Sequence, residues 1–238
     1  MKILLRGAME EEIDIFCNYF EVSRVETIFE YKFFISEYKG NTIIISLTKE
    51  GIINTTIATM LAIEKFNPDV VVNQGCAGAH LKDLEIGDVI IGRKSVYIND
   101  FKTPYKSEKM GSSSLEWLPN KKRSFEVFSS EELIQLAESI RYKKGSRLGV
   151  LGSGDLHSKE YDRIVYLNKL FGEDCEDIES VASLKVCEMF NVKKIAMRII
   201  SNNNLKSEVF DKSTCTEMQK YVINLIDLLI EKHSINRN

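Results

Sequence analysis

The chain contains 238 residues with a formal net charge of −3 and five cysteines, and this mild acidity excludes a broadly basic nucleic-acid-binding surface. The cysteines are odd in number and include no Cys-x-x-Cys pair, so we expect no disulfide framework or zinc site and a reducing cytoplasmic location. Residues 1–238 suffice for a single domain, and no apolar stretch approaches the roughly 18 residues of a membrane span, so no membrane partner is expected.

Strands and helices alternate in the first part of the chain. Residues 3–5 form an apolar run that predicts a buried strand, and residues 10–20 carry apolar side chains at helical spacing. Two strands of a hairpin, an amphipathic helix that ends at Asn67-Pro68 and another buried strand follow, in this order: 31–38, 42–47, 53–66 and 69–73.

The alternation continues around one irregular segment. Residues 86–97 predict a strand, whereas residues 99–129 show no clear period and are typical of a functional or mobile loop. A helix, a strand, two helices, a strand and a closing helix follow, in this order: 130–140, 147–152, 159–170, 178–190, 192–200 and 216–232. This order predicts an α/β fold of one domain, with a mixed central β-sheet flanked by helices.

Small or polar residues follow several of these strands. They form loops at 7–12, 75–79, 153–158 and 201–204, and a group of acids at 176–179 opens a helix. Because ligands of α/β proteins bind beyond the carboxyl ends of strands, we expect a cleft at these segments.

The first of these loops carries three acids in a row, Glu10, Glu11 and Glu12. Three carboxylates would repel a phosphate, so an acid facing a ligand here suits a water or a hydroxyl group. Acids in a first helical turn also complement the helix dipole, and this is the better account of Glu10 and Glu11.

The order and spacing of these segments resemble the 5′-methylthioadenosine/S-adenosylhomocysteine nucleosidases of the nucleoside phosphorylase superfamily. The matching motifs are Gly7-Ala8-Met9-Glu10-Glu11-Glu12, Gly75-Cys76-Ala77-Gly78, Ser153-Gly154-Asp155, Glu176-Asp177-Ile178-Glu179-Ser180-Val181-Ala182 and Arg198-Ile199-Ile200-Ser201-Asn202. The resemblance implies a nucleoside phosphorylase-like fold without a metal or organic cofactor. It also implies a purine nucleoside substrate, whose bond between ribose and purine is cleaved by water.

The resemblance also implies roles for individual residues. Glu12 would activate the water, and Glu179 would hold the ribose hydroxyls with Ile178 packing beneath the sugar. Arg198 and Ser201 would brace the acids and the purine loop. Further residues implied in the pocket are Ala8, Met9, Cys76, Ala77, Gly78, His157 and Asp177. Family members form homodimers, in which Tyr105 of a neighbour and Phe210 of the same subunit would close the 5′ side.

Asn202 departs from the family pattern, which has Asp at this place to protonate purine N7. An amide cannot release that proton, because it only donates an N–H and accepts at its carbonyl oxygen. Three interpretations stay open. The chain cleaves adenine nucleosides slowly or with another proton source, it cleaves 6-oxopurine nucleosides as futalosine hydrolases do, or it binds a nucleoside with weak turnover.

His157 is a second departure, since the family usually has Phe there. Histidine can stack on a purine and carry a proton near neutral pH, so His157 is a candidate for the missing acid, with a plain surface loop as the alternative. Phosphorolysis stays open as well, because Arg6 ends the first strand and Arg93 lies in the strand at 86–97. We nevertheless expect hydrolysis, since the first loop is acidic and no pair of arginines clusters at the second.

Overall fold

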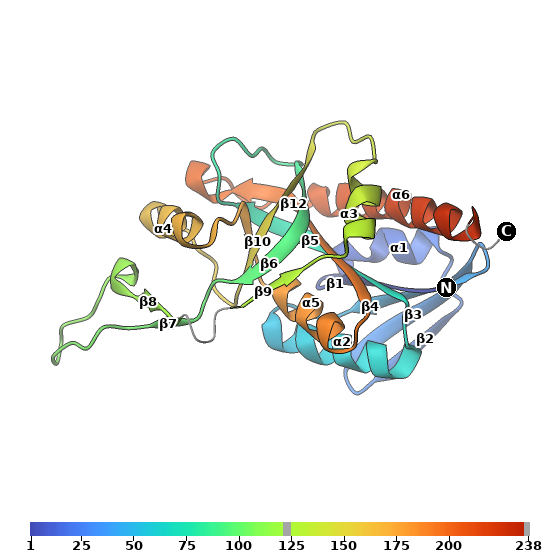
Figure 1. Cartoon of the computed structure of the whole chain (residues 1–238), viewed down its shortest axis with the longest axis horizontal. Coiled ribbons are helices and arrows are strands. Elements are labelled where there is room, and N and C mark those ends of the chain that lie inside the picture. The colour runs from blue at the N-terminus through green and yellow to red at the C-terminus, as the bar shows by residue number, and fades with distance from the viewer. Residues whose placement is uncertain (121–124, 236–238) are drawn as a thin grey trace.

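The computed structural model describes residues 1–120 and 125–235, and their main sheet is mixed and carries helices on both faces (Figure 1). The strands of this sheet are β1 (Lys2–Gly7), β2 (Arg24–Ile28), β3 (Tyr31–Tyr38), β4 (Asn41–Leu47), β5 (Val70–Ala79), β6 (Val89–Tyr97), β9 (Glu126–Phe128), β10 (Ser146–Ser153), β11 (Cys175–Asp177) and β12 (Lys193–Asn203). Their order is β11-β10-β6-β12-β5-β1-β4-β3-β2, with β9 beside β6.

Parallel and antiparallel pairs occur in this one sheet. β1 pairs in parallel with β4 and β5, and β12 pairs in parallel with β5. β6 and β12 run antiparallel, as do β2, β3 and β4. A short separate hairpin consists of β7 (Phe101–Lys102) and β8 (Leu118–Pro119). The predicted mixed α/β sheet flanked by helices is therefore confirmed.

The helices pack on the sheet through its alternating apolar side chains. They are α1 (Asp14–Tyr19), α2 (Ile52–Phe66), α3 (Glu131–Glu138), α4 (Tyr161–Phe171), α5 (Ser180–Met189) and α6 (Ser213–Ile235). Ile3 and Leu5 of β1 belong to the core beneath α1, α3 and α6, whereas Leu4 belongs to the core beneath α2 and α5. Successive residues of a strand point to opposite faces, so a fully apolar β1 fills both cores.

Several predicted boundaries were wrong. The helix predicted at 10–20 is a 3-10 turn over Glu10–Glu12 followed by α1, because the Glu12 side chain turns inward to accept backbone N–H groups. The small-residue loop predicted at 75–79 is the end of β5, and most of the polar loop at 201–204 is the end of β12. Small and polar residues stay in the ladder here because neighbouring strands satisfy their backbone groups.

The acids at 176–179 were predicted to open a helix, but Glu176 and Asp177 lie in β11 and the helix begins at Ser180. β11 is only three residues long, too short to show a pattern. The strand predicted at 86–97 begins later, at Val89. The irregular segment at 99–129 contains β7, β8 and β9, and its residues 121–124 lie outside the described part.

Within the described ranges, no helix combines the length and apolar character that crossing a membrane requires.

Candidate active site

A cavity of about 270 Å³ opens where β1, β5, β11 and β12 end. Its wall consists of Ala8, Met9, Glu12, Glu50, Cys76, Ala77, Gly78, His157, Glu176, Asp177, Ile178, Glu179, Ser201, Asn202 and Phe210. All predicted site residues except Arg198 and Tyr105 therefore surround one space. Arg198 is fully buried behind the wall, and Tyr105 is fully exposed in the single chain.

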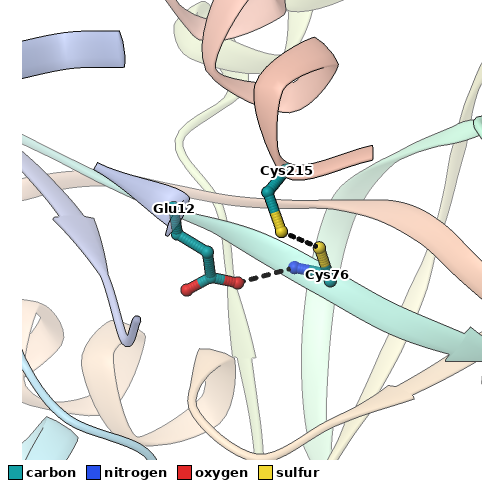
Figure 2. A group of neighbouring side chains, drawn as sticks. All are labelled: Glu12, Cys76 and Cys215. Carbon is teal, nitrogen blue, oxygen red and sulfur yellow. Dashed lines mark hydrogen bonds between the residues drawn. The ribbon is translucent and has the colours of Figure 1, made fainter. Parts of the chain in front are cut away.

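Glu12 is held rigidly at the end of β1. Its Oε2 accepts the backbone N–H of Ala8 at 2.7 Å and that of Met9 at 3.3 Å, and its Oε1 accepts the N–H of Cys76 at 3.0 Å (Figure 2). Gly75 allows this approach, because a Cβ there would lie 2.6 Å from Oε1. The carboxylate is thus buried and oriented by backbone donors while it still faces the cavity.

Asp177, Glu179 and Arg198 form an ion cluster beside Glu12. Arg198 Nε lies 3.2 Å from Asp177 Oδ2, and Arg198 Nη2 lies 3.6 Å from Glu179 Oε2. Asp177 Oδ1 also accepts the Ser153 hydroxyl at 2.8 Å and the N–H groups of Glu179 and Ser180 at 2.9 and 2.8 Å. Asp177 is therefore a structural anchor, and Glu179 beside it lines the cavity.

Burial and mutual repulsion control the charge of these acids. Burial raises the pKa of Glu12, against the opposing effects of Arg198 and the three backbone N–H groups. Burial raises the pKa of Glu179 to about 8, with the Asp177 and Glu12 carboxylates adding to the rise and Arg198 opposing it. The single Arg198 guanidinium thus lies among three carboxylates, those of Glu12, Asp177 and Glu179. Because carboxylates outnumber cations here, this part of the cavity suits hydroxyl groups and a water better than an anion.

Asn202, another residue of the cavity wall, belongs to a chain of polar groups. Its Oδ1 lies 3.0 Å from the Ser201 hydroxyl, and its Nδ2 donates to Asn204 Oδ1 at 2.6 Å. Asn204 Nδ2 in turn donates to the Ser158 carbonyl at 3.0 Å. The amide at position 202 is therefore oriented by its neighbours.

Glu176 anchors the loop that carries His157. Its carboxylate accepts the N–H of Ser158 at 2.7 Å and the Ser158 hydroxyl at 2.9 Å, and His80 Nε2 lies 3.5 Å away. Burial opposes a charge on His80, but its contacts with Glu173 and Glu176 raise its pKa to about 9. His157 itself is exposed at the cavity mouth. The loop's position therefore depends on a buried ionic network.

Three polar residues of the site were not among the predicted site residues. Glu176 was assigned only to a helix start, and its place in β11 turns it toward Ser158. Asn204 stood in an asparagine run without an assigned role, and Glu50 carried no recognisable signal. Sequence spacing cannot show which polar side chains converge on a cavity wall when they come from different strands.

One group of side chains has the composition of a metal site. Glu12, Cys76 and Cys215 have ligand atoms within 4.8 Å of one another, and the two sulfurs face each other at 3.1 Å (Figure 2). Two sulfurs bound to tetrahedral zinc at about 2.3 Å would lie roughly 3.8 Å apart. The hydrogen bond with Cys215, burial and the Glu12 carboxylate raise the pKa of Cys76. The sulfur separation is shorter than a shared tetrahedral zinc would give, so this arrangement does not fit such a metal.

Comparisons with known proteins agree with this geometry. The family model of the phosphorylase superfamily matches residues 2–231. A 5′-methylthioadenosine/S-adenosylhomocysteine nucleosidase of Staphylococcus haemolyticus is 28% identical over 229 residues, which cover 94% of this chain and 97% of that protein. The nucleosidase of Bacillus subtilis is 28% identical over 205 residues, covering 85% and 86% of the two chains.

Solved structures show the same fold along the whole chain. A futalosine hydrolase mutant of Helicobacter pylori superposes with a TM-score of 0.80 at 25% identity, covering 95% of this chain and 99% of that one. An Asp→Asn mutant of the H. pylori nucleosidase, with 5′-methylthioadenosine in its active site, gives 0.79 at 25% identity and covers 95% and 98%. With a family model that matches nearly every residue and relatives aligned end to end, the chain belongs to the phosphorylase superfamily.

Proposed function

We propose that this protein hydrolyses the N-glycosidic bond of a purine nucleoside. The observation that carries the proposal is Glu12, a buried carboxylate that three backbone N–H groups orient into a cavity at the sheet's edge. A positioned carboxylate can take a proton from water as that water attacks the sugar carbon C1′. Relatives that align along nearly the full chain are nucleosidases by name.

Glu179 is the proposed partner of the ribose hydroxyls. It lies in the cavity wall next to Ile178, and its backbone and carboxylate are held by Asp177, Arg198 and the N–H of Gly51 at 3.4 Å. A carboxylate whose pKa is raised to about 8 can accept a hydroxyl hydrogen or share a proton with it. The diol would replace water as its hydrogen-bond partner.

Water is favoured over phosphate as the attacking group by the charge of the wall. Among residues 1–120 and 125–235, the wall of this cavity contains neither Arg nor Lys but five carboxylates, those of Glu12, Glu50, Glu176, Asp177 and Glu179. Arg198 is engaged by Asp177 and Glu179, and Arg93 is exposed on β6. A phosphate dianion would meet net negative charge here, whereas phosphorylases bind it with converging cations.

The leaving purine would meet the amide of Asn202. This amide can donate an N–H to N7 and so stabilise the leaving base without protonating it. The second candidate, cleavage of a 6-oxopurine nucleoside, is favoured by this amide and by the similarity to a futalosine hydrolase. A third candidate is nucleoside binding with weak turnover, and the H. pylori Asp→Asn mutant with 5′-methylthioadenosine in its active site is consistent with it.

We also propose a cytoplasmic homodimer. Figure 1 shows β7 and β8 on an arm that projects from the body of the protein, and Tyr105 lies between these two strands. Its side chain and that of Leu118 on the same arm are exposed in the single chain. An arm of this kind can reach the cavity mouth of a second copy, where Phe210 is half exposed.

Incubation with a panel of purine nucleosides tests the proposal. The panel contains adenosine, 5′-methylthioadenosine, S-adenosylhomocysteine, inosine and futalosine, and the released base is identified by chromatography. We expect release of a free base from at least one of them and strong loss of release in Glu12→Gln. Binding without any base release would instead support the nucleoside-binding candidate, and neither binding nor release would refute a nucleoside site.

A further inference from the structure

The polar chain next to Asn202 has only one self-consistent direction. The Ser158 carbonyl can only accept, so the Asn204 end that contacts it at 3.0 Å is the amide nitrogen. The Asn204 oxygen then points to Asn202 at 2.6 Å, and Asn202 must present its own nitrogen there. The Asn202 oxygen consequently faces the Ser201 hydroxyl at 3.0 Å. An amide flip at either residue would place like groups against each other.

Position 202 is therefore constrained to be a hydrogen-bond donor by Asn204. A carboxylate at this position would bring one of its oxygens against the Asn204 oxygen at 2.6 Å, so that two acceptors would face each other. Such an acid would have to stay protonated and would give its hydrogen to Asn204 instead of to a purine. Asn204, which the Ser158 carbonyl orients, thus requires a side chain with an N–H donor at position 202, and asparagine supplies it.

Each amide of the pair has a second N–H hydrogen. Among residues 1–120 and 125–235, Asn202 Nδ2 donates only to Asn204, and Asn204 Nδ2 donates only to Ser158. Asn202 lines the active-site cavity, and Asn204 lines an adjoining space of about 570 Å³ that shares its wall with Asn202. Gly78 makes room for this arrangement, because a Cβ there would lie 2.6 Å from Asn204 Nδ2.

The two remaining hydrogens determine what the base must offer. A carbonyl oxygen that accepts one bond is satisfied, whereas an N–H covered by a ligand and left without an acceptor is costly. The oxygens of Asn204 and Ser158 each already accept one hydrogen bond, and the Asn202 oxygen shares the hydrogen of the Ser201 hydroxyl with the Ala77 carbonyl. A ligand with two adjacent acceptors therefore matches this corner better than one with an acceptor beside a donor.

We propose that Asn204 is a specificity-determining residue that acts with Asn202 as a two-donor element for N7 and O6 of a 6-oxopurine base. Adenine offers an acceptor at N7 but an amino group at C6, which would meet an amide hydrogen. This proposal rests on the proposed nucleosidase function and names the base of its substrate. In it, Asn204 both orients the Asn202 amide and contacts the base.

Equilibrium binding in the Glu12→Gln variant tests the proposal without turnover. The ligands are pairs that differ only at C6, inosine with adenosine and 5′-methylthioinosine with 5′-methylthioadenosine, measured by calorimetry. We expect the 6-oxo ligand of each pair to bind about 10-fold tighter or more than the 6-amino ligand. The 6-amino ligand loses one hydrogen bond and leaves one amide N–H without an acceptor. Adding Asn204→Ala should remove most of this preference, whereas adding Asn18→Ala, an exposed helix position, should leave it unchanged.

A second variant keeps the test decisive if Asn204→Ala is poorly folded. Asn202→Asp in the same background should weaken 6-oxopurine binding progressively as the pH rises, because the acid loses the proton that Asn204 requires. Tighter binding of the 6-amino members, or an unchanged preference in either variant, would overturn the proposal. If the wild-type protein still releases a base in those cases, the nucleosidase function stands and only the base assignment falls.

Discussion

Replacing Glu12 with Gln separates its chemical role from its structural one. The substitution keeps the side chain's size but turns one carboxylate oxygen into an NH2 group. Oε2 accepts two backbone N–H groups and Oε1 accepts one, so the amide places its oxygen toward Ala8 and Met9 and its nitrogen toward the N–H of Cys76. The variant therefore sets the new NH2 group against the Cys76 N–H, so that two donors face each other without an acceptor.

The two expected effects differ in size. One unsatisfied buried N–H costs about 1–3 kcal/mol of folding free energy. Removing a carboxylate whose pKa is raised by burial offsets part of this cost, because less charge is buried. Loss of the general base lowers kcat by about 10²–10⁴-fold, or roughly 2.7–5.4 kcal/mol of activation free energy. We therefore expect a folded protein with a strongly reduced kcat and little change in KM.

The assay combines steady-state kinetics on the preferred nucleoside with a thermal melt. Glu11→Gln is the matched control, because Glu11 is a neighbouring acid that pairs on the surface with Lys212 at 2.5 Å and does not line the cavity. Its kcat should equal that of the wild type. A folded Glu12→Gln protein with near wild-type kcat would refute the role of Glu12 in activating water.

Three further substitutions test the environment of the site. Arg198→Lys should raise KM by about 10-fold or more, because a single ammonium cannot contact both Asp177 and Glu179 as the guanidinium does. Initial-rate kinetics measure this change, with the surface variant Glu11→Gln as the control. Glu179, with a pKa of about 8 in the folded chain against an ordinary 4.5, binds more protons folded than unfolded. The unfolding free energy should therefore fall as the pH rises from about 4.5 to 8. Urea titrations of the Glu179→Gln variant should show a weaker fall than the wild type, and an equal fall would contradict the raised pKa of Glu179. Arg6 is buried with no hydrogen-bond partner for its guanidinium within the described residues, and burial lowers its pKa to about 10. Arg6→Met should raise the unfolding free energy by about 1–3 kcal/mol, and a loss of stability in the urea titration would contradict this expectation.

Much of the fold followed from local patterns. Continuous apolar runs identified β1 and the start of β5, and helical spacing with the Asn67-Pro68 stop placed α2 within one residue of its start. The missed strands β2 and β11 lack such patterns. β2 is a largely exposed edge strand, and β11 is a short polar strand held by pairing with β10 and β5. Both strands form because they pair with strands elsewhere in the fold, and the local sequence does not encode this pairing.

The sequence predicted most residues of the candidate site but few of the contacts between them. The resemblance named Glu12, Glu179 and Asn202, and the structure brings them to one cavity. The Glu12 carboxylate accepts two N–H groups of its own loop, but its bond from Cys76 depends on the register between β1 and β5. The direction of the Asn202 amide depends on Asn204, which the distant Ser158 carbonyl orients in turn. These long-range contacts come from the packing of distant segments, so no motif could supply them.

The dependence of turnover on phosphate tests the central claim most directly. The preferred nucleoside is incubated with the protein in phosphate-free buffer and in buffer with added phosphate, and the sugar product is identified by mass spectrometry. The account predicts free base and free reducing sugar at the same rate in both buffers, because a water held by Glu12 attacks C1′. Turnover that requires phosphate and yields a sugar 1-phosphate would contradict it.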